Sequence, residues 1–494
     1  MRLSFSSVAA ARLRVDTVIY FMFEDSDLFE AQRRQISEQF PGIDHVFATG
    51  DFTGKKNTTL QAYNNDGNIR RVILSGLGES VNFSLHSIRL ASAGAAKYLS
   101  NFKVKSPAVH LPHLGNFSAA QIAQTIIEGM ELSLYKFDTY FSDKDDKRFV
   151  LDKLTFFCDD KKWLSDAKAG AQTGIHVAGG VNEARDLGNA PANEIYPETL
   201  AKRAVQLGKE FGFKVTVLDK RKITSANMQG LLAVNQGSVK PPTFIIMEYK
   251  GGKAGEQPVV LVGKGVTFDT GGISLKPGAG MGDMKTDMHG SATVIGTMRA
   301  VAAAKLPINL VGLVPATDNM PSGSAILPGD IITYSNGISV EIDNTDAEGR
   351  LILADALIYA AKYKPQAVID LATLTGACMI ALGHYTSGMM GTSRELLGRI
   401  AEAGKRTREH VCELPLHEEY EEQLKSNVAD IINVGGRPAG AITAGLFLKR
   451  FAGDLPWVHM DIAGTGILPK ASALNPRGAS GVGVRLLFDM LSNW

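Results

Sequence analysis

The sequence has few cysteines, no long apolar run and almost no net charge. Its three cysteines, Cys158, Cys378 and Cys412, are far apart and form no CxxC pair. Buried free thiols in a reducing compartment are therefore expected. No apolar run reaches the roughly 18 residues that span a bilayer, so no membrane association is expected. The net charge is +1, which excludes a global field that attracts nucleic acid.

The length and composition indicate a folded chain of several domains. At 494 residues the chain is too long for one ordinary core. With 21% charged and 45% hydrophobic residues it has a globular balance rather than a disordered one. Residues 1–160 alternate strand-like runs (15–21, 70–77, 108–111) with amphipathic helical runs (83–99, 119–134), which predicts a small α/β domain without a catalytic cluster.

The sequence pattern changes after residue 160. Residues 161–188, although interrupted by glycines, predict a linking helix. In residues 189–494, helical segments separate the buried strands 243–249, 259–262, 308–314, 367–371 and 458–462. This pattern predicts a second α/β domain, the catalytic one, with a mixed, mostly parallel sheet covered by helices on both faces.

The most informative segment is NTDAEGRL, residues 344–351. It lies between a predicted strand, 337–342, and a predicted helix, 351–363, a junction where open α/β sheets place ligands. If the segment is extended, the side chains of Asp346, Glu348 and Arg350 point to one side. Carboxylates so close repel one another unless a cation or arginine neutralises them, so the segment predicts a metal site.

A second charged cluster follows the apolar strand 259–262. It contains Lys264, Asp269, Lys276 and Asp287, separated by glycine-rich loops that let the backbone approach a ligand. Four acids in the two segments are too many for one catalytic ion. They suit a pair of divalent ions that activates a water molecule, with one lysine made neutral by the cations. The other lysine and Arg350 would hold developing negative charge.

Other catalytic motifs fail at specific positions. Lys264 lacks the upstream glycine spacing of a P-loop, and His417-Glu418 lacks the second histidine of HExxH. An EF-hand from Asp343 has Glu348 where glycine is required, and GxSxG breaks at Val482.

These residues resemble those of the leucyl aminopeptidases, a family of dinuclear metallopeptidases. The matching blocks span the C-terminal two-thirds of the chain in order: RDLGNAPAN (185–193), VGKGVTFDTGGISLK (262–276), NTDAEGRL (344–351), DLATLTGA (370–377), NVGGRPAGAITAGLFL (433–448), DIAGTG (461–466) and GVGVRLL (481–487). The N-terminal third carries no motif that matches, and this part of the chain is typically variable in the family.

The resemblance implies a ligand set and catalytic residues. The tighter ion would be held by Lys264 as a neutral amine, Asp269, Asp287 and Glu348. The exchangeable ion would be held by Asp269, Asp346 and Glu348. Lys276 would polarise the scissile carbonyl, and Arg350 would anchor a bicarbonate that shuttles the proton of the nucleophilic water. The implied metal is Zn²⁺, with Mn²⁺, Co²⁺ or Mg²⁺ able to replace it at the exchangeable position.

The implied reaction is removal of the N-terminal residue, preferably leucine, from peptides and aminoacyl amides with a free N-terminus. By the same resemblance, the pocket would be lined by Met284, Thr373, Gly376 and Ala463, and Leu374 would help position the backbone beside the site. Two positions depart from the family pattern. His289 stands where many members have a small residue. It either lies near the site and influences metal affinity or pH dependence or, as we prefer, is a helix N-terminal histidine that faces away. Gly466 stands where some members have a bulky residue, which leaves the pocket width open.

The resemblance also implies a homohexamer in the cytoplasm. Two alternatives are a nucleic-acid-binding regulator, against which the near-zero net charge argues, and another two-metal hydrolase such as a phosphatase. Residues 1–15 contain arginines and serines without an acid, as organellar transit segments do. A strand-like run follows at once, so organellar targeting is the less favoured location.

Overall fold

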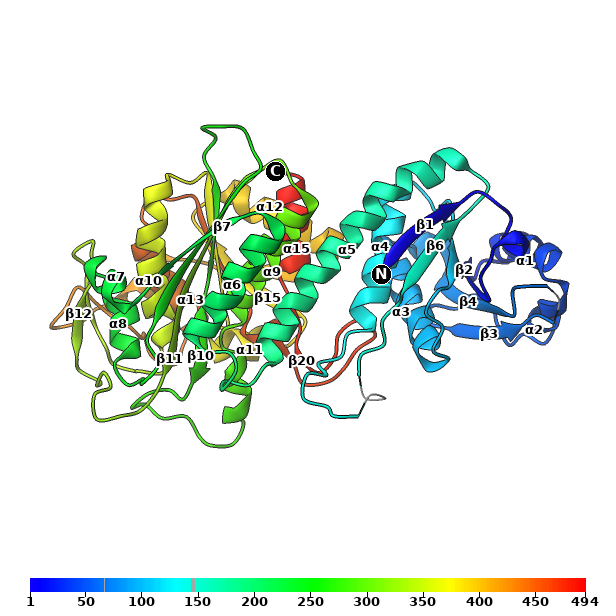
Figure 1. Cartoon of the computed structure of the whole chain (residues 1–494). Coiled ribbons are helices and arrows are strands. Elements are labelled where there is room, and N and C mark those ends of the chain that lie inside the picture. The colour runs from blue at the N-terminus through cyan, green and yellow to red at the C-terminus, as the bar shows by residue number, and fades with distance from the viewer. Residues whose placement is uncertain (66, 144–146) are drawn as a thin grey trace. The chain divides into compact units, whose positions relative to one another are not determined.

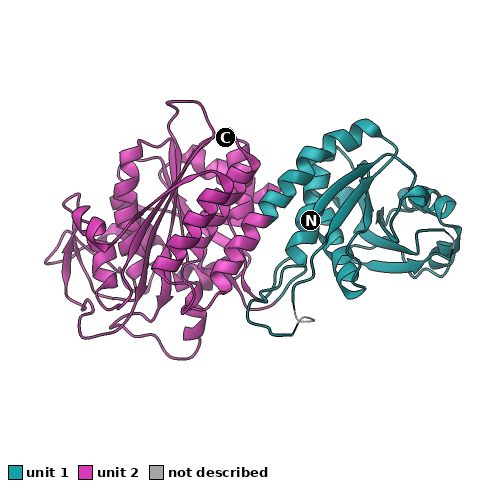
Figure 2. Ribbon diagram, viewed as in Figure 1, with its two compact units in different colours: residues 1–178, 471–476 teal, residues 179–470, 477–494 magenta. Residues whose placement is uncertain are grey.

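Alternating apolar strands build two large sheets in this chain, whose computed structural model describes residues 1–65, 67–143 and 147–494 (Figure 1). The sheets belong to two compact units (Figure 2). Unit 1 contains Met1–Ala178 and Ala471–Pro476, and unit 2 contains Gly179–Lys470 and Arg477–Trp494. The division falls within helix α5 (Lys161–Asn189). The boundaries at residues 160 and 188 that the sequence suggested stay a prediction.

Unit 1 has a six-stranded sheet in the order β1-β6-β5-β2-β4-β3, with only the β3–β4 pair antiparallel. Its strands are β1 (Arg2–Ser6), β2 (Thr17–Phe23), β3 (Thr59–Tyr63), β4 (Arg71–Gly78), β5 (Ala108–His110) and β6 (Lys153–Phe157). Its helices before α5 are α1 (Ser26–Gln39), α2 (Asp44–Ala48), α3 (Leu85–Asn101) and α4 (Ala119–Ser133).

The central strand β2 explains why this sheet is covered on both faces. All of its residues are buried, and successive side chains of a strand point to opposite faces. Ile19 and Phe21 pack in one apolar cluster with α3 and α4. Val18 and Tyr20 pack in a second cluster.

Unit 2 has a nine-stranded sheet in the order β16-β15-β18-β14-β9-β11-β8-β7, with β10 paired to β11. Its strands are β7 (Lys214–Leu218), β8 (Thr243–Lys250), β9 (Val259–Gly263), β10 (Gly265–Asp269), β11 (Asn309–Asn319), β14 (Ala367–Ala372), β15 (Thr386–Gly391), β16 (His410–Glu413) and β18 (Trp457–Asp461). The small sheets contain β12 (Ile331–Thr333), β13 (Ser339–Glu341), β17 (Ile431–Ile432), β19 (Ile467–Leu468) and β20 (Gly478–Ala479).

The helices of unit 2 cover both faces of this sheet. They are α6 (Pro197–Phe211), α7 (Lys220–Ser225), α8 (Gln229–Asn235), α9 (His289–Ala304), α10 (Glu348–Ala360), α11 (Gly376–Leu382), α12 (Arg394–Thr407), α13 (Gly440–Ala452), α14 (Ala463–Gly466) and α15 (Val484–Ser492). Helices α8, α10 and α13 pack on one face, where Val260 and Val262 of β9 join their apolar cluster. Helices α6, α9 and α15 pack together on the other face.

The predicted fold class is thereby confirmed. Most strand pairs of the large sheets are parallel, and antiparallel pairing occurs at β3 with β4, at β8 with β7 and β11, and at β15 with β18. Short 3₁₀ segments complete the structure: η1 (Ala10–Arg12), η2 (Pro41–Ile43), η3 (Ser80–Asn82), η4 (Met281–Thr286), η5 (Ala361–Tyr363) and η6 (Glu418–Leu424).

Two further expectations concerned free buried cysteines and membrane-spanning segments. All three cysteines are free; Cys158 and Cys378 are buried, whereas Cys412 is only half-buried. In the part of the chain that the structure describes, no helix is both long and apolar enough to cross a membrane.

Candidate metal centre

Charged side chains from both predicted segments meet where the parallel strands of unit 2 end. Lys264 lies between β9 and β10, and Asp269 is the last residue of β10. Lys264 needs a glycine neighbour, because a Cβ on Gly349 would lie 2.6 to 2.9 Å from the lysine side chain. The carboxyl ends of parallel strands are where open sheets bind ligands, and the structure places the cluster there.

The backbone of the 344–351 segment differs from the prediction of an extended strand. Helix α10 begins at Glu348, and Asp346 lies in the preceding turn. Residues two positions apart on a helix point about 200° apart, so Glu348 and Arg350 diverge. The Glu348 carboxylate lies 2.8 Å from Lys264 Nζ, whereas Arg350 Nη1 donates to the carbonyl of Asn433 at 2.7 Å. The prediction that one extended face carries all three charges is wrong.

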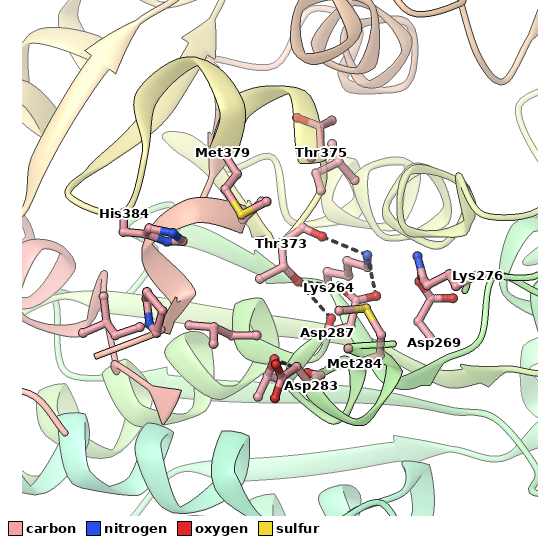
Figure 3. A pocket seen from close by; sticks show the side chains of 18 of the residues that line it. Lys264, Asp269, Lys276, Asp283, Met284, Asp287, Thr373, Thr375, Met379 and His384 are labelled. Atoms are coloured by element: carbon pink, nitrogen blue, oxygen red, sulfur yellow. Dashed lines mark hydrogen bonds and ion pairs between the residues drawn. The ribbon is translucent and has the colours of Figure 1, made fainter. Parts of the chain in front are cut away.

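Each lysine pairs with two of the four carboxylates. Lys264 Nζ lies 2.6 Å from Asp287 and 2.8 Å from Glu348. It also donates to the carbonyl of Thr373 at 2.9 Å. Figure 3 shows Lys264 between Asp287 and Thr373. Asp287 and Glu348 therefore share the positive charge of one lysine.

The second lysine lies at the other end of the cluster. Lys276 Nζ lies 2.8 Å from Asp269 and forms a further ion pair with Asp346. Lys264 is 3% exposed and Lys276 is 21% exposed, so Lys276 is the more accessible of the two to a molecule in the cavity.

The carboxylates fit divalent cations. Oxygens of Asp269, Asp346 and Glu348 lie within 4.8 Å of one another. Glu348 Oε2 is buried without a hydrogen-bond partner among the described residues. Four carboxylates face two lysine ammonium groups in this cluster. A buried carboxylate oxygen without a partner is costly, and a cation would satisfy it.

The shifts in pKa are consistent with this excess of carboxylates over ammonium groups. Burial raises the pKa of Glu348, and the neighbouring Asp269 raises it further. Burial likewise raises the pKa of Asp287 and Asp346. Burial alone would lower the pKa of Lys264, but Asp287 and Glu348 raise it above its ordinary value. In the absence of cations this lysine is an ammonium, and bound cations would oppose its charge.

Sequence reasoning missed Asn319, which supports the cluster from the end of β11. Its Nδ2 donates to Asp269 Oδ1 at 2.9 Å and to the carbonyl of Thr345 at 3.0 Å. It therefore joins the two charged segments. The predicted strand ended at residue 314, whereas β11 continues to Asn319, so no local signal pointed to this residue.

Asp461 was also missed, although it opens one of the matching blocks. Its fully buried carboxylate accepts from the backbone N–H of Leu374 and of Ala463 at 3.3 and 3.1 Å. It also accepts from Thr375 Oγ1 at 2.6 Å. The side chain thus ties the loop after β14 to the loop after β18.

A cavity of about 560 Å³ opens beside the cluster. All four carboxylates and both lysines line it, as do the five predicted substrate-binding residues, Met284, Thr373, Leu374, Gly376 and Ala463. Figure 3 shows Met284 and Thr373 beside Lys264 and Asp287. Arg350 is not among the lining residues.

His289 and Gly466 lie behind the wall of this cavity. His289 is the first residue of α9 and is fully buried, and its Nε2 accepts from the N–H of Gly481 at 3.1 Å. Burial lowers its pKa to about 4. A Cβ on Gly466 would meet Thr373 Cγ2 at 3.2 Å and the His289 ring at 3.4 Å. Gly466 therefore leaves room for Thr373.

Two family models match the chain. The model described as the cytosol aminopeptidase family, catalytic domain, matches residues 182–488. The model described as the N-terminal domain of the same family matches residues 19–144.

Relatives and solved structures match over most of the length. A probable cytosol aminopeptidase of Syntrophotalea carbinolica is 47% identical over 89% of each chain. One of Pseudomonas fluorescens is 43% identical over 99% of each chain. A mutant tomato leucine aminopeptidase has a TM-score of 0.88 at 31% identity, covering 100% of this chain and 97% of its own. The bottromycin maturation enzyme BotP in complex with Mn has a TM-score of 0.85 at 30% identity, covering 97% and 99%.

Proposed function

The chain belongs to the cytosol aminopeptidase family of metal-dependent aminopeptidases, and we propose that it prefers leucine or a similar apolar residue at the N-terminus of its substrates. Peptides and aminoacyl amides with a free N-terminus are the substrates. The observation that carries this proposal is the convergence of four carboxylates and two lysines on one cavity. Apolar side chains of that cavity, such as Met284, give an adaptable surface for an apolar side chain.

The family uses two divalent ions, and the residues of this cluster have the donors to hold them. We assign Lys264, Asp269, Asp287 and Glu348 to one ion. Asp269, Asp346 and Glu348 are assigned to the other, so that two carboxylates are shared. When bound, the ions would lower the pKa of a water molecule and polarise the substrate carbonyl. Zn²⁺ is the proposed metal, with Mn²⁺, Co²⁺ or Mg²⁺ at the exchangeable position, and the BotP complex with Mn supports one of these.

The side chains around the ions orient the substrate. Asp287 accepts from Thr373 Oγ1 at 2.7 Å, which holds its carboxylate in place near the free α-amine. Lys276, the more exposed lysine, donates to the carbonyl oxygen as negative charge develops there. We also propose that Arg350, whose Nε is buried without a hydrogen-bond partner among the described residues, holds a bicarbonate ion. Burial lowers the pKa of Arg350 to about 10, so it stays cationic at neutral pH.

The proposed assembly is a homohexamer in the cytoplasm. Membership of the family supports both statements, and the relatives are called cytosol aminopeptidases. Light scattering of the purified chain tests the number of subunits.

Hydrolysis of leucine amide tests the function. Wild-type protein treated with a chelator should lose activity and regain it when Zn²⁺ or Mn²⁺ is returned. Glu348→Ala should lose more than about 100-fold in kcat/KM, since even residues behind the ligands cost 10–100-fold. Metal content per subunit should fall in parallel.

The matched control is Glu402→Ala, which removes an exposed glutamate of α12 and should behave as wild type. Robust turnover by the chelated protein or by Glu348→Ala would contradict the proposal. Faster hydrolysis of a phosphate ester than of leucine amide would favour a different two-metal hydrolase.

A further inference from the structure

The cavity extends beyond the charged cluster to a region with a different lining. Across the cavity from Asp269 and Lys276, Figure 3 shows His384 and, near it, Met379. The rest of the lining is mostly apolar or small, with Gly376, Met379, Ala463, Ile467, Leu468 and Pro469, but it also includes the charged side chains of Asp283 and Arg477. Pockets of about 300–1,000 Å³ hold drug-sized ligands, so this cavity has room for a side chain longer than leucine.

His384 is a polar residue in this mostly apolar region, and its tautomer follows from its contacts. It lies between α11 and β15, and its Nδ1 is 2.9 Å from the carbonyl oxygen of Gly464. A carbonyl only accepts, so Nδ1 carries the hydrogen and the neutral ring has an acceptor at Nε2. No other hydrogen bond of His384 occurs within the described ranges, although the residue is only half-buried. The Gly464 contact thus fixes the ring and leaves one acceptor available.

The position of Gly464 connects this acceptor to the substrate side chain. Gly464 follows Ala463, one of the residues assigned to the leucine pocket. A Cβ on Gly464 would lie 2.1 Å from the carbonyl oxygen of Gly383 and 3.4 Å from Met379 Cα. The backbone of α14 therefore packs directly against the residues around His384. A side chain that passes Ala463 and Gly376 enters the region that His384 borders.

We propose that His384 is a specificity-determining residue that accepts a hydrogen bond from the tip of a long N-terminal side chain. This inference rests on the proposed aminopeptidase function and adds a substrate class to it: aromatic or long side chains that end in a donor. A donor buried in an apolar wall without a partner costs about 1–3 kcal/mol, whereas a neutral hydrogen bond contributes about 0.5–1.5 kcal/mol. The acceptor therefore separates tyrosine from phenylalanine, which differ only in the hydroxyl group.

The test compares tyrosine amide with phenylalanine amide. The wild-type kcat/KM ratio should favour tyrosine amide by about 2- to 10-fold, the range that a neutral hydrogen bond gives. His384→Phe keeps a planar ring without an acceptor, so its ratio should fall to one or below. His384→Gln keeps an acceptor oxygen and should restore part of the preference. His417→Phe, at an exposed histidine that precedes η6, is the matched control and should keep the wild-type ratio.

Each possible ratio of the two kcat/KM values either supports or overturns the role of His384. A wild-type ratio of one or below overturns the proposal without any variant, as does a ratio that His384→Phe leaves unchanged. Because both substrates are measured on the same preparation, partial folding or metal loss cancels in the ratio. If wild-type protein hydrolyses neither leucine amide nor the aromatic amides, the aminopeptidase function itself fails. If it hydrolyses them without distinguishing tyrosine from phenylalanine, only the role of His384 fails.

Discussion

Two glycines near the pocket differ in how much room they leave for a side chain. A Cβ on Gly376 would meet nothing within 4 Å, whereas a Cβ on Gly466 would lie 3.2 Å from Thr373. Gly376 lines the cavity and begins α11. A larger residue at position 376 would therefore narrow the pocket without disturbing the fold. A larger residue at position 466 would displace Thr373.

Gly376→Ala and Gly466→Ala should separate selectivity from stability. Gly376→Ala should leave the free energy of unfolding within about 0.5 kcal/mol, but a methyl group in the pocket should lower the leucine-to-alanine amide selectivity about 10-fold. Gly466→Ala should cost about 1 kcal/mol or more of stability, because Thr373 must move. Urea denaturation measures the stability of each variant, and kcat/KM for leucine amide and alanine amide measures its selectivity. Equal effects of the two variants would refute this distinction.

A buried ion pair beside the metal centre predicts a pH-dependent contribution to stability. His459 Nδ1 lies 2.6 Å from Asp370, and both side chains are 0% exposed. Burial alone would lower the pKa of His459, but Asp370 raises it above its ordinary value. A histidine whose folded pKa exceeds its unfolded pKa of about 6.5 binds its proton more tightly in the folded state. Its stabilisation is complete below about pH 6.5 and is lost as the pH rises through the folded pKa.

His459→Gln should therefore destabilise the protein more at pH 6 than at higher pH. The measurement is the difference in free energy of unfolding between wild type and variant, taken by urea denaturation across this range. Subtraction removes the titration of all groups that the two proteins share. A difference that stays constant or grows with rising pH would show that His459 is neutral in the folded state.

At the scale of elements, helix α5 forms in spite of the glycines within it, as the sequence predicted. The helix continues from Lys161 to Asn189. Its glycines lie where the helix packs closely against the backbones of neighbouring helices. A Cβ on Gly170 would lie 1.9 Å from the carbonyl oxygen of Ala120 in α4, and one on Gly180 would lie 2.5 Å from the carbonyl oxygen of Gly296 in α9. Close packing against neighbouring backbones offsets the low helix propensity of glycine.

Gly170→Ala should therefore destabilise unit 1. Alanine gains about 1 kcal/mol of helix propensity over glycine, but the clash with the α4 backbone forces the helices apart and costs more, with a net loss of about 1–3 kcal/mol. Gly398→Ala in α12 is the matched control, because a Cβ there meets nothing within 4 Å. That variant should be as stable as wild type or more stable. Chemical denaturation of both variants measures the effect, and a stabilised Gly170→Ala would disprove the packing role.

The same scale explains how the site is assembled. Asp461 ends β18 and ties down the loop that follows β14, because these two strands are parallel neighbours with Ala372 opposite Asp461. The pocket residues on both loops thus hold their positions through one carboxylate. The sheet order, rather than any local motif, brings them together.

At the scale of the whole molecule, the proposed metal ligands all belong to unit 2. Cation binding should therefore stabilise that unit selectively. Ligand at 100 times its dissociation constant stabilises the folded state by about 2.7 kcal/mol. Restoring Zn²⁺ or Mn²⁺ to chelated protein should raise the melting temperature by several degrees and slow hydrogen exchange in unit 2.

Glu348→Ala should lose most of that shift, and exchange in unit 1 should change little in either protein. Protection that rises equally in both units, or a shift that survives in Glu348→Ala, would place the cations elsewhere.

The sequence by itself determined the local chemistry. The apolar runs predicted several of the strands and helices that form both α/β units, and the acids and lysines of two segments predicted one charged cluster. The strand β1 escaped this reasoning, since Arg2–Ser6 is a weakly apolar run. The conformation at Glu348 was mispredicted, because alternating charges fit an extended chain and a helix start equally well. The residue-level roles assigned through the family resemblance stay proposals.

Only the tertiary structure decided which distant groups meet. Asn319 and His384 carry no signal in their own neighbourhoods, and Asp461 opens a matching block that does not reveal its contacts, because the partners of all three lie far away along the chain. Asp461, for example, accepts from Leu374, 87 positions earlier. Such contacts follow from the order of strands in the sheet, which side-chain periodicity does not encode. Sequence pattern fixes which face of a strand is buried, whereas the pairing of strands fixes which loops share a cavity.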